Sequence, residues 1–141
     1  MKVVLKRLND ACHLEARNEQ GAIIHADGAP EIGGKNLGFR PMQLLLAGIG
    51  SCSCMDIISI LQKQKQTLDE LEVSVDGDRE KNKTPSLFEK IHVHFHLTGH
   101  LDEDKVKRAV DLSMKTYCSV ARILEKTAVI TYTFEITNLV T

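Results

Sequence analysis

LLLAGIGSCSCMDIISIL, residues 44–61, is the least charged stretch of this 141-residue chain. Pro41 precedes it and suits the first position of a helix, because the backbone N–H that proline lacks would be unpaired there anyway. We therefore expect a helix from Pro41 to about Gln66. The stretch is about as long as a membrane span, but it contains two glycines, three serines and Asp56. This composition favours a helix that is buried within protein.

Alternating apolar residues predict strands on both sides of this helix. Before it, we expect strands at residues 3–8, 12–16 and 22–26, a turn at residues 18–21 and a glycine-rich loop at residues 28–40. After it, we expect strands at residues 72–76, 88–97 and 129–136, and a second long helix that is capped by Asp102 and carries one apolar stripe to Leu124. This order and the short hairpins predict a single α+β domain over residues 1–141, with antiparallel rather than parallel sheets.

The composition excludes several classes of protein. Eighteen basic and nineteen acidic residues give a net charge of −1, without a basic stripe for nucleic acid or a polybasic segment for a membrane surface. Met1 leads into an alternating pattern, not into the apolar run of a signal peptide. We therefore expect a cytoplasmic protein, in which cysteines are more often catalytic, metal-binding or simply buried than disulfide-bonded.

The four cysteines are candidates for different roles. Cys52 and Cys54 are separated by about 200° of helical rotation, so they should neither bond to each other nor share a metal. Cys118 lies at the edge of the apolar stripe of the second long helix. If the two helices pack together, Cys52 and Cys118 can form a reversible redox pair, in which one thiol becomes a sulfenic acid and the other resolves it as a disulfide. The alternative is a Cys52 that only fills space, and structural filling is the favoured interpretation for Cys12 and Cys54.

Residues 41–61, PMQLLLAGIGSCSCMDIISIL, followed by a strand, a hairpin and KTYCSVARIL at residues 115–124, resemble the OsmC/Ohr family of thiol-dependent hydroperoxide reductases. The resemblance covers nearly the whole chain. It implies that Cys52, eleven residues after Pro41, attacks the substrate and that Cys118 resolves the product. It also implies an OsmC-like fold, an intertwined homodimer with active sites at the subunit interface, and no metal or organic cofactor. Dithiols such as lipoyl groups would supply the electrons, in a response to oxidative or osmotic stress.

Departures from the family pattern make the chain more similar to less characterised OsmC-like branches. Peroxidase members carry a glutamate directly after the helix-starting proline, where this chain has Met42, and an arginine that pairs with that glutamate. Ser119 stands where proline usually follows the second cysteine.

Because burial raises the pKa of a thiol, a nearby cation is needed to form the thiolate. The candidates are Arg17 and Arg40. Arg40 lies 12 residues before Cys52, about 18 Å along a helix, so it would act only across a dimer interface. A solvated surface charge is the alternative for both arginines.

Three histidines, His92, His94 and His96, alternate along the strand predicted at residues 88–97. They share one strand face at spacings of about 6.5–7 Å, and His-x-His is a chelating pattern for zinc or copper. However, the opposite face of this strand is apolar. The pattern therefore favours the solvent face of an amphipathic strand over a metal site.

Two main functions remain open from the sequence. The first is a thiol peroxidase that reduces organic hydroperoxides through Cys52 and Cys118. The second, indicated by Met42 and Gln43 at the position of the expected acid, is an OsmC-type dimer that binds a small hydrophobic or electrophilic ligand at the subunit interface. Metal storage or sensing through the histidines is a third and less favoured alternative.

Overall fold

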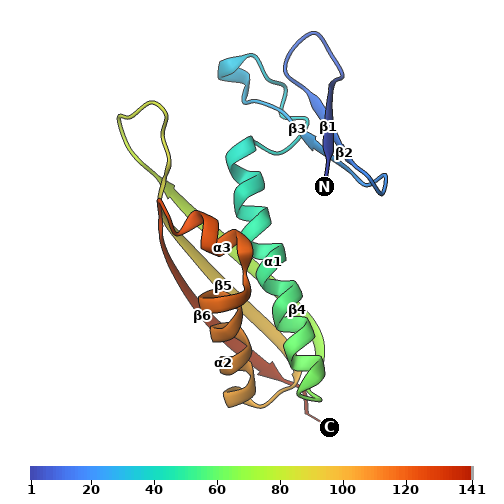
Figure 1. The fold of residues 1–141 in the computed structure, drawn as a ribbon, viewed down its shortest axis with the longest axis vertical. Helices are drawn as coiled ribbons and strands as arrows, with labels where there is room; N and C mark the ends of the chain where they lie inside the picture. Colours follow the sequence, from blue (N-terminus) through green and yellow to red (C-terminus); the bar gives the residue numbers. More distant parts are fainter. Residues whose placement is uncertain (141) are drawn as a thin grey trace. The chain divides into compact units, whose positions relative to one another are not determined.

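A computed structural model describes residues 1–140, and the chain forms two compact units, residues 1–45 and the residues from 46 onward. The first unit holds a three-stranded antiparallel sheet in the order β1–β2–β3 (Figure 1). Its elements are β1 (Val3–Arg7), β2 (Leu14–Asn18), β3 (Ile23–Ala26) and a short 3-10 helix, η1 (Pro30–Ile32). The predicted turn at residues 18–21 is present, since the Asn18 side chain accepts hydrogen bonds from the N–H groups of Gln20 and Ala22.

Helix α1 (Pro41–Lys63) begins in the first unit and continues into the second. The second unit holds a three-stranded sheet in the order β4–β5–β6, with helices against one face (Figure 1). Its other elements are β4 (Thr67–Arg79), β5 (Phe88–His100), α2 (Glu103–Leu112), a π-helix η2 (Ser113–Tyr117), α3 (Ser119–Leu124) and β6 (Val129–Asn138). The expected α+β order is confirmed, although α1 ends three residues earlier than predicted. The strands of the second unit extend further than predicted, whereas those of the first unit are shorter or shifted by two residues.

The pairing of β5 with β6 differs from the expected antiparallel sheet, because these two strands are parallel. A parallel pair requires a crossover connection, which is usually helical. Here α2, η2 and α3 form that crossover between the end of β5 and the start of β6. The hairpin between β4 and β5 is antiparallel, as predicted.

Alternation along β5 places the core of the second unit on one face of the sheet. Ile91, Val93, Phe95 and Leu97 are buried, and the intervening histidines lie on the other face. The helices contribute Ile49, Ile57 and Leu61 from α1, and Val106, Ala109 and Val110 from α2. Asp102 caps α2 by accepting a hydrogen bond from the Lys105 N–H at 3.0 Å, as the sequence predicts.

Helix α1 buries only one side within its own chain. It is long and apolar enough to cross a membrane by length and composition, yet Ile49, Ser53, Ile57 and Leu61 are fully buried in the protein. Gly50 lets this side approach β4, since an added Cβ would lie 3.1 Å from Val75. The opposite side of α1, which includes Met55 and Ile58, is exposed.

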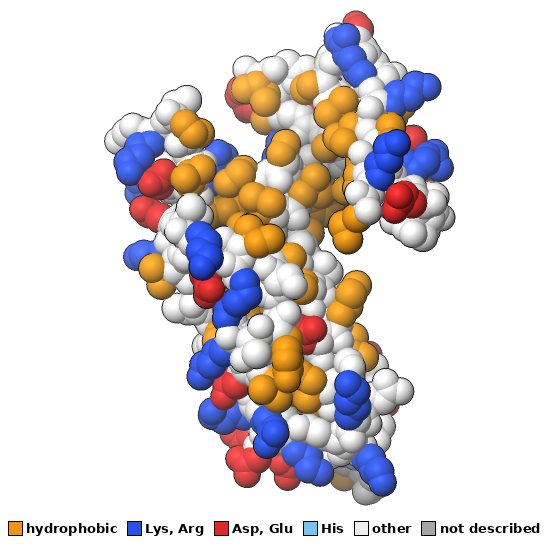
Figure 2. All heavy atoms as spheres, viewed as in Figure 1, with side chains coloured by type: hydrophobic (Ala, Val, Ile, Leu, Met, Phe, Trp, Pro, Cys, Tyr) orange, Lys and Arg blue, Asp and Glu red, His pale blue; other side chains and the backbone are white. Residues whose placement is uncertain are grey.

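Large apolar side chains are exposed on both units (Figure 2). On α1, Met55 is 69% exposed and Ile58 is 47% exposed. On the first sheet, Val4 and Leu5 of β1 and Ile24 of β3 are each at least half exposed. Isolated apolar side chains at a surface are ordinary, whereas large contiguous apolar patches are typical of interaction surfaces.

Asp27 organises the loop that joins β3 to α1. Its carboxylate accepts hydrogen bonds from the N–H groups of Gly28 at 2.7 Å, and Lys35 and Leu37 at 3.1 Å each. The Cys12 thiol donates to the same carboxylate at 3.2 Å. This contact agrees with the structural role that the sequence favours for Cys12, although Cys12 precedes β2 and does not lie on a strand.

Candidate functional site

Cys52 lies in the middle of α1 and is half-buried. The neighbouring Ser53 points into the core, where its hydroxyl donates to the Ile49 carbonyl one turn earlier at 2.7 Å. Cys54 is half-buried as well, and burial raises the pKa of its thiol.

Cys118 is placed by an irregular turn, not by the continuous helix that the sequence suggests. The regular hydrogen bonds of α2 end at Leu112, and one π-helical turn follows, which the Cys118 N–H closes by donating to the Ser113 carbonyl at 2.8 Å. Cys118 itself is extended, with φ −69° and ψ 101°. Its sulfur caps α3 by accepting a hydrogen bond from the Ala121 N–H at 3.4 Å. The apolar periodicity continues through this break, so the sequence pattern does not reveal it.

The structure brings Cys52 and Cys118 together and adds a third group, Asp56. One donor atom from each of these three side chains lies within 4.8 Å of the other two. Cys52 and Asp56 are four residues apart, so they share one face of α1 on successive turns. Ser113 orients the carboxylate, since its hydroxyl donates to Asp56 Oδ2 at 2.9 Å. The sequence gives the i, i+4 spacing that would identify Asp56, but the prediction of the site omits it.

The cluster of Cys52, Asp56 and Cys118 disfavours negative charge on the buried thiol. Cys118 is fully buried, and this burial raises the pKa of its thiol to about 11. The hydrogen bond from Ala121 lowers the pKa, whereas the adjacent Cys52 thiol and the Asp56 carboxylate raise it. Cys118 is therefore protonated at neutral pH.

Arg122 supports the turn that carries Cys118. Its guanidinium donates to the backbone carbonyls of Met114 and Lys115 in η2, and it forms an ion pair with Glu125 at 3.2 Å. Carbonyls freed by an irregular turn need such donors. Arg122 is thus a positioning residue for Cys118, and the prediction from the sequence does not include it.

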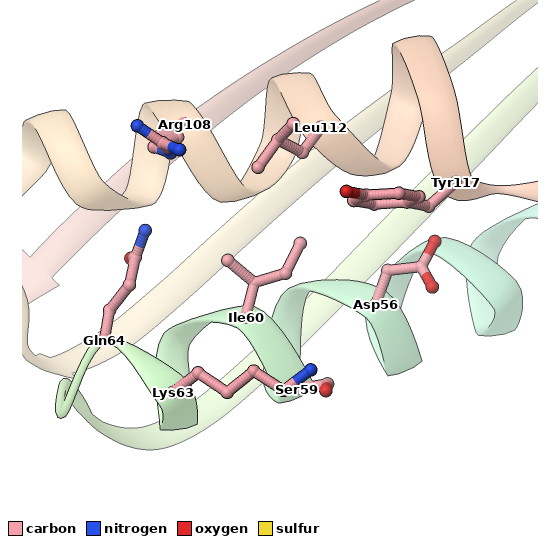
Figure 3. A pocket seen from close by; sticks show the side chains of 8 residues that line it. All are labelled: Asp56, Ser59, Ile60, Lys63, Gln64, Arg108, Leu112 and Tyr117. Carbon is pink, nitrogen blue, oxygen red and sulfur yellow. The ribbon is translucent and has the colours of Figure 1, made fainter.

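A groove of about 490 Å³ runs between α1 and α2 and reaches the cluster at Asp56. Figure 3 shows Asp56 and Tyr117 at one end, and Gln64 and Arg108 at the other. Ile60 and Leu112 lie between these ends, so the middle of the groove is apolar. Lys63 and Ser59 complete the lining.

The two predicted arginines are engaged elsewhere in the first unit. Arg17, on β2, forms an exposed ion pair with Glu15 at 3.1 Å. The Arg40 guanidinium donates to the side chain of Asn36 and, weakly, to backbone carbonyls in the loop before α1. Gln43, next to the position of the expected acid, accepts a hydrogen bond from the Arg40 N–H at 2.9 Å. It therefore caps the start of α1 and does not orient a guanidinium.

The three histidines bind neighbouring side chains on the sheet face away from the core. Each ring lies within hydrogen-bond distance of a threonine on β6, and His94 and His96 also approach Glu135, at 3.6 and 3.7 Å. They make no compact three-ligand set with other donors in residues 1–140. A partly exposed strand face, as the sequence favours, accounts for them.

Known proteins are similar to this chain in sequence and in fold. The family model described as OsmC-like protein matches residues 33–133, across the boundary between the two units. Protein YhfA of Escherichia coli K12 is 44% identical over 97 residues, which cover 68% of this chain and 72% of YhfA. The crystal structure of a hypothetical protein from Aquifex aeolicus has a TM-score of 0.84 at 29% identity, covering 98% of this chain and 96% of that chain. An organic hydroperoxide resistance protein from Legionella pneumophila shares the fold, with a TM-score of 0.70 at 17% identity over 96% of this chain and 97% of that chain.

Proposed function

The chain belongs to the OsmC-like family, and from this membership and its thiol pair we propose that it is a thiol-dependent peroxidase that reduces organic hydroperoxides. The observation that carries the proposal is the placement of the two sulfur atoms within 4.8 Å of each other, with Cys52 half-buried and Cys118 buried. A substrate can approach Cys52, while Cys118 is held ready behind it. This asymmetry suits an attacking and a resolving thiol.

The reaction balances with two thiols and one hydroperoxide. The Cys52 thiolate attacks a peroxide oxygen and breaks the O–O bond, which leaves a sulfenic acid on Cys52 and an alkoxide that takes up a proton to become the alcohol. The Cys118 sulfur then attacks the Cys52 sulfur, forms the disulfide and expels hydroxide, which leaves as water with the Cys118 proton. An external dithiol returns both cysteines to thiols by exchange and is itself oxidised to a disulfide.

The proposed reaction needs a cation that stabilises the Cys52 thiolate. Within residues 1–140, no lysine or arginine forms a hydrogen bond or ion pair with Cys52, Asp56 or Cys118. We propose that a second copy of the chain supplies Arg17 or Arg40, in a homodimer that covers the exposed apolar side chains of α1 and β1. The partners would thus be a second copy, a small hydroperoxide and a dithiol of the lipoyl type. The free thiols favour a cytoplasmic location, and a role in stress response follows from the reaction.

A second candidate function is a dimer of the same fold that binds a small hydrophobic or electrophilic ligand with little turnover. Two observations favour it. A carboxylate, not a cation, lies within 4.8 Å of both thiols. Met42 stands where an activating acid was expected, and the adjacent Gln43 caps the helix. An electrophile would then react with Cys52 without a resolving step.

Turnover of cumene hydroperoxide with a dithiol reductant tests the proposal. Cys52→Ser should lose turnover, and Cys118→Ser should accumulate a sulfenic acid at Cys52 that dimedone traps. Cys54→Ser is the matched control and should keep wild-type turnover, because Cys54 lies outside the cluster. An unchanged rate in Cys52→Ser rules out the peroxidase. Absence of both turnover and trapped sulfenic acid in the wild type favours the ligand-binding function. A loss of turnover in Arg17→Gln or Arg40→Gln would identify the cation.

A further inference from the structure

We propose that Cys52, Asp56 and Cys118 also form a binding site for Zn²⁺. Thiolate sulfur and carboxylate oxygen are both ligands that zinc takes in proteins. The site does not rest on the peroxidase reaction, because the same three groups would bind the metal whether or not Cys52 attacks a peroxide. The family resemblance implies no metal for turnover, so zinc would control access to the thiols and take no part in the chemistry.

The separation of the donor atoms fits one ion. The three atoms lie within 4.8 Å of one another. With Zn–S bonds of about 2.3 Å and Zn–O bonds of about 2.0–2.2 Å, tetrahedral geometry places ligand atoms roughly 3.5–3.8 Å apart. Movements of about 1 Å or less in the side chains therefore close the site. Cys52 and Asp56 come from successive turns of one rigid helix, and Cys118 comes from the start of α3.

The three donor groups of the cluster can ionise together only if a cation binds them. Two thiolates and one carboxylate would place three negative charges in this small, partly buried space. No lysine or arginine forms a hydrogen bond or ion pair with them in the part of the chain that the structure describes. A zinc ion compensates most of this charge and binds the sulfurs as thiolates, since a coordinating thiol is deprotonated.

Surrounding groups already hold two of the three ligands. Ser113 donates to Asp56 Oδ2 at 2.9 Å, which fixes the carboxylate and leaves lone pairs on both oxygens. The Ala121 N–H donates to Cys118 Sγ at 3.4 Å. Hydrogen bonds of this kind orient metal ligands and stabilise a coordinated thiolate. Because Asp56 also lines the groove between α1 and α2, a water molecule or a small ligand can reach the fourth coordination position from there.

Zinc binding and the disulfide exclude each other. A disulfide holds its sulfurs about 2.05 Å apart, whereas a tetrahedral zinc ion holds them roughly 3.8 Å apart. Formation of the disulfide also removes both thiolate ligands. The metal-bound form is therefore a reduced and protected state of the two cysteines.

Cobalt(II) is the probe for this site, because thiolate coordination gives it a charge-transfer absorption that imidazole and carboxylate ligands do not. Fully reduced protein titrated with Co²⁺ should show this absorption at one ion per chain, and Zn²⁺ should abolish it. Cys52→Ser and Cys118→Ser should each lose most of the absorption. Asp56→Asn should keep it but weaken Zn²⁺ binding by about tenfold or more, measured by competition with a chromophoric chelator.

Two control variants address the other candidate ligands. Cys54→Ser removes a thiol on another face of α1, and His94→Ala breaks the alternating histidines of β5. Both should bind as the wild type does, and circular dichroism checks the folding of every variant. Thiolate absorption that survives in both Cys52→Ser and Cys118→Ser, or zinc binding that only His94→Ala removes, overturns the proposal. Metal binding is measured without peroxide, so its failure would leave the peroxidase proposal unaffected.

Discussion

At the scale of single residues, Asp56 affects both the ionisation and the metal-binding capacity of the two cysteines. A carboxylate beside two cysteines opposes the formation of thiolates and at the same time supplies a hard ligand for a cation. Ser113 fixes its orientation from the π-helical turn. The buried thiol is therefore protonated at neutral pH, and the proposed metal or partner arginine would favour its ionisation.

Neutralising Asp56 should lower the pKa of Cys118 from its raised value of about 11. Burial remains the main cause of the raised pKa, so Asp56→Asn should bring the pKa down without restoring the ordinary value. The pH dependence of the Cys118 ¹³Cβ resonance reports this pKa directly. Asp69→Asn, an exposed change on β4, should leave it unchanged. Equal titration curves for wild type and Asp56→Asn would show that the carboxylate does not act on this thiol.

Asp27 should make the loop before α1 sensitive to acid. Burial of its carboxyl group opposes ionisation, but hydrogen bonds from Leu37, Gly28, Cys12 and Lys35 outweigh it and lower the pKa from 3.8 to about 2. Because the folded pKa lies below the unfolded one, the stabilisation is complete above pH 3.8 and is lost as pH falls through about 2.

The test is urea unfolding of the wild type and Asp27→Asn across this acid range. The variant should be less stable above pH 3.8, and the difference should shrink as the pH approaches 2. Glu19→Gln is the control, because Glu19 is exposed and its carboxylate forms no hydrogen bond or ion pair with any residue that the structure describes. A stability difference that stays constant with pH would contradict the assignment.

At the scale of elements, the π-helical turn η2 places Cys118 in the site. It interrupts the crossover between β5 and β6 and turns the chain so that the sulfur of Cys118 caps α3 and faces α1. Irregular turns of this kind are frequent at functional sites. The two carbonyl groups that accept from Arg122 show how this turn is held in place.

Replacing Arg122 should therefore destabilise this turn. Arg122→Ala removes hydrogen bonds from a charged donor to two carbonyls, so we expect a loss of about 1.5–3 kcal/mol in the free energy of unfolding. Glu125→Gln removes only the partly exposed ion pair and should cost less than about 1 kcal/mol. Chemical denaturation of both variants measures the difference. Equal losses would mean that the ion pair, and not the carbonyl contacts, is what Arg122 contributes.

At the scale of the whole molecule, the exposed apolar side chains are the basis for the proposed dimer. Met55 on α1 and Leu5 on β1 are more than half exposed, together with Val3 and Val4. A second copy that covers these side chains would also be the source of the missing cation. Assembly and catalysis are then linked, because a dissociated chain would keep its thiols but lose their activation.

Sedimentation velocity should show a dimer of the 15.7 kDa chain. Met55→Lys places a charge among apolar contacts and should shift the population toward monomer with a parallel loss of turnover. Lys126→Gln, a change at an exposed site on the turn after α3, serves as the control. A wild-type protein that sediments as a monomer at every concentration, with full activity, would refute the link.

Most of the elements, and the buried faces of the amphipathic ones, are predictable from the sequence pattern. Alternation in β5 identified its buried residues and its histidine face, Pro41 marked the start of α1, and Asp102 marked the start of α2. These features are readable because helix and strand periodicity depends only on neighbours in the chain. The family resemblance rests on the same segments and agrees with the match over residues 33–133.

Packing between distant parts of the chain sets the parallel pairing of β6, the break at Cys118, the position of Asp56 beside the two cysteines and its hydrogen bond from Ser113. Asp56 and Ser113 are 57 residues apart in the chain, and no local pattern records which distant side chain a group will meet. The pKa of Cys118 depends on those distant neighbours and on burial. The sequence therefore identified the two cysteines, whereas packing set their chemistry.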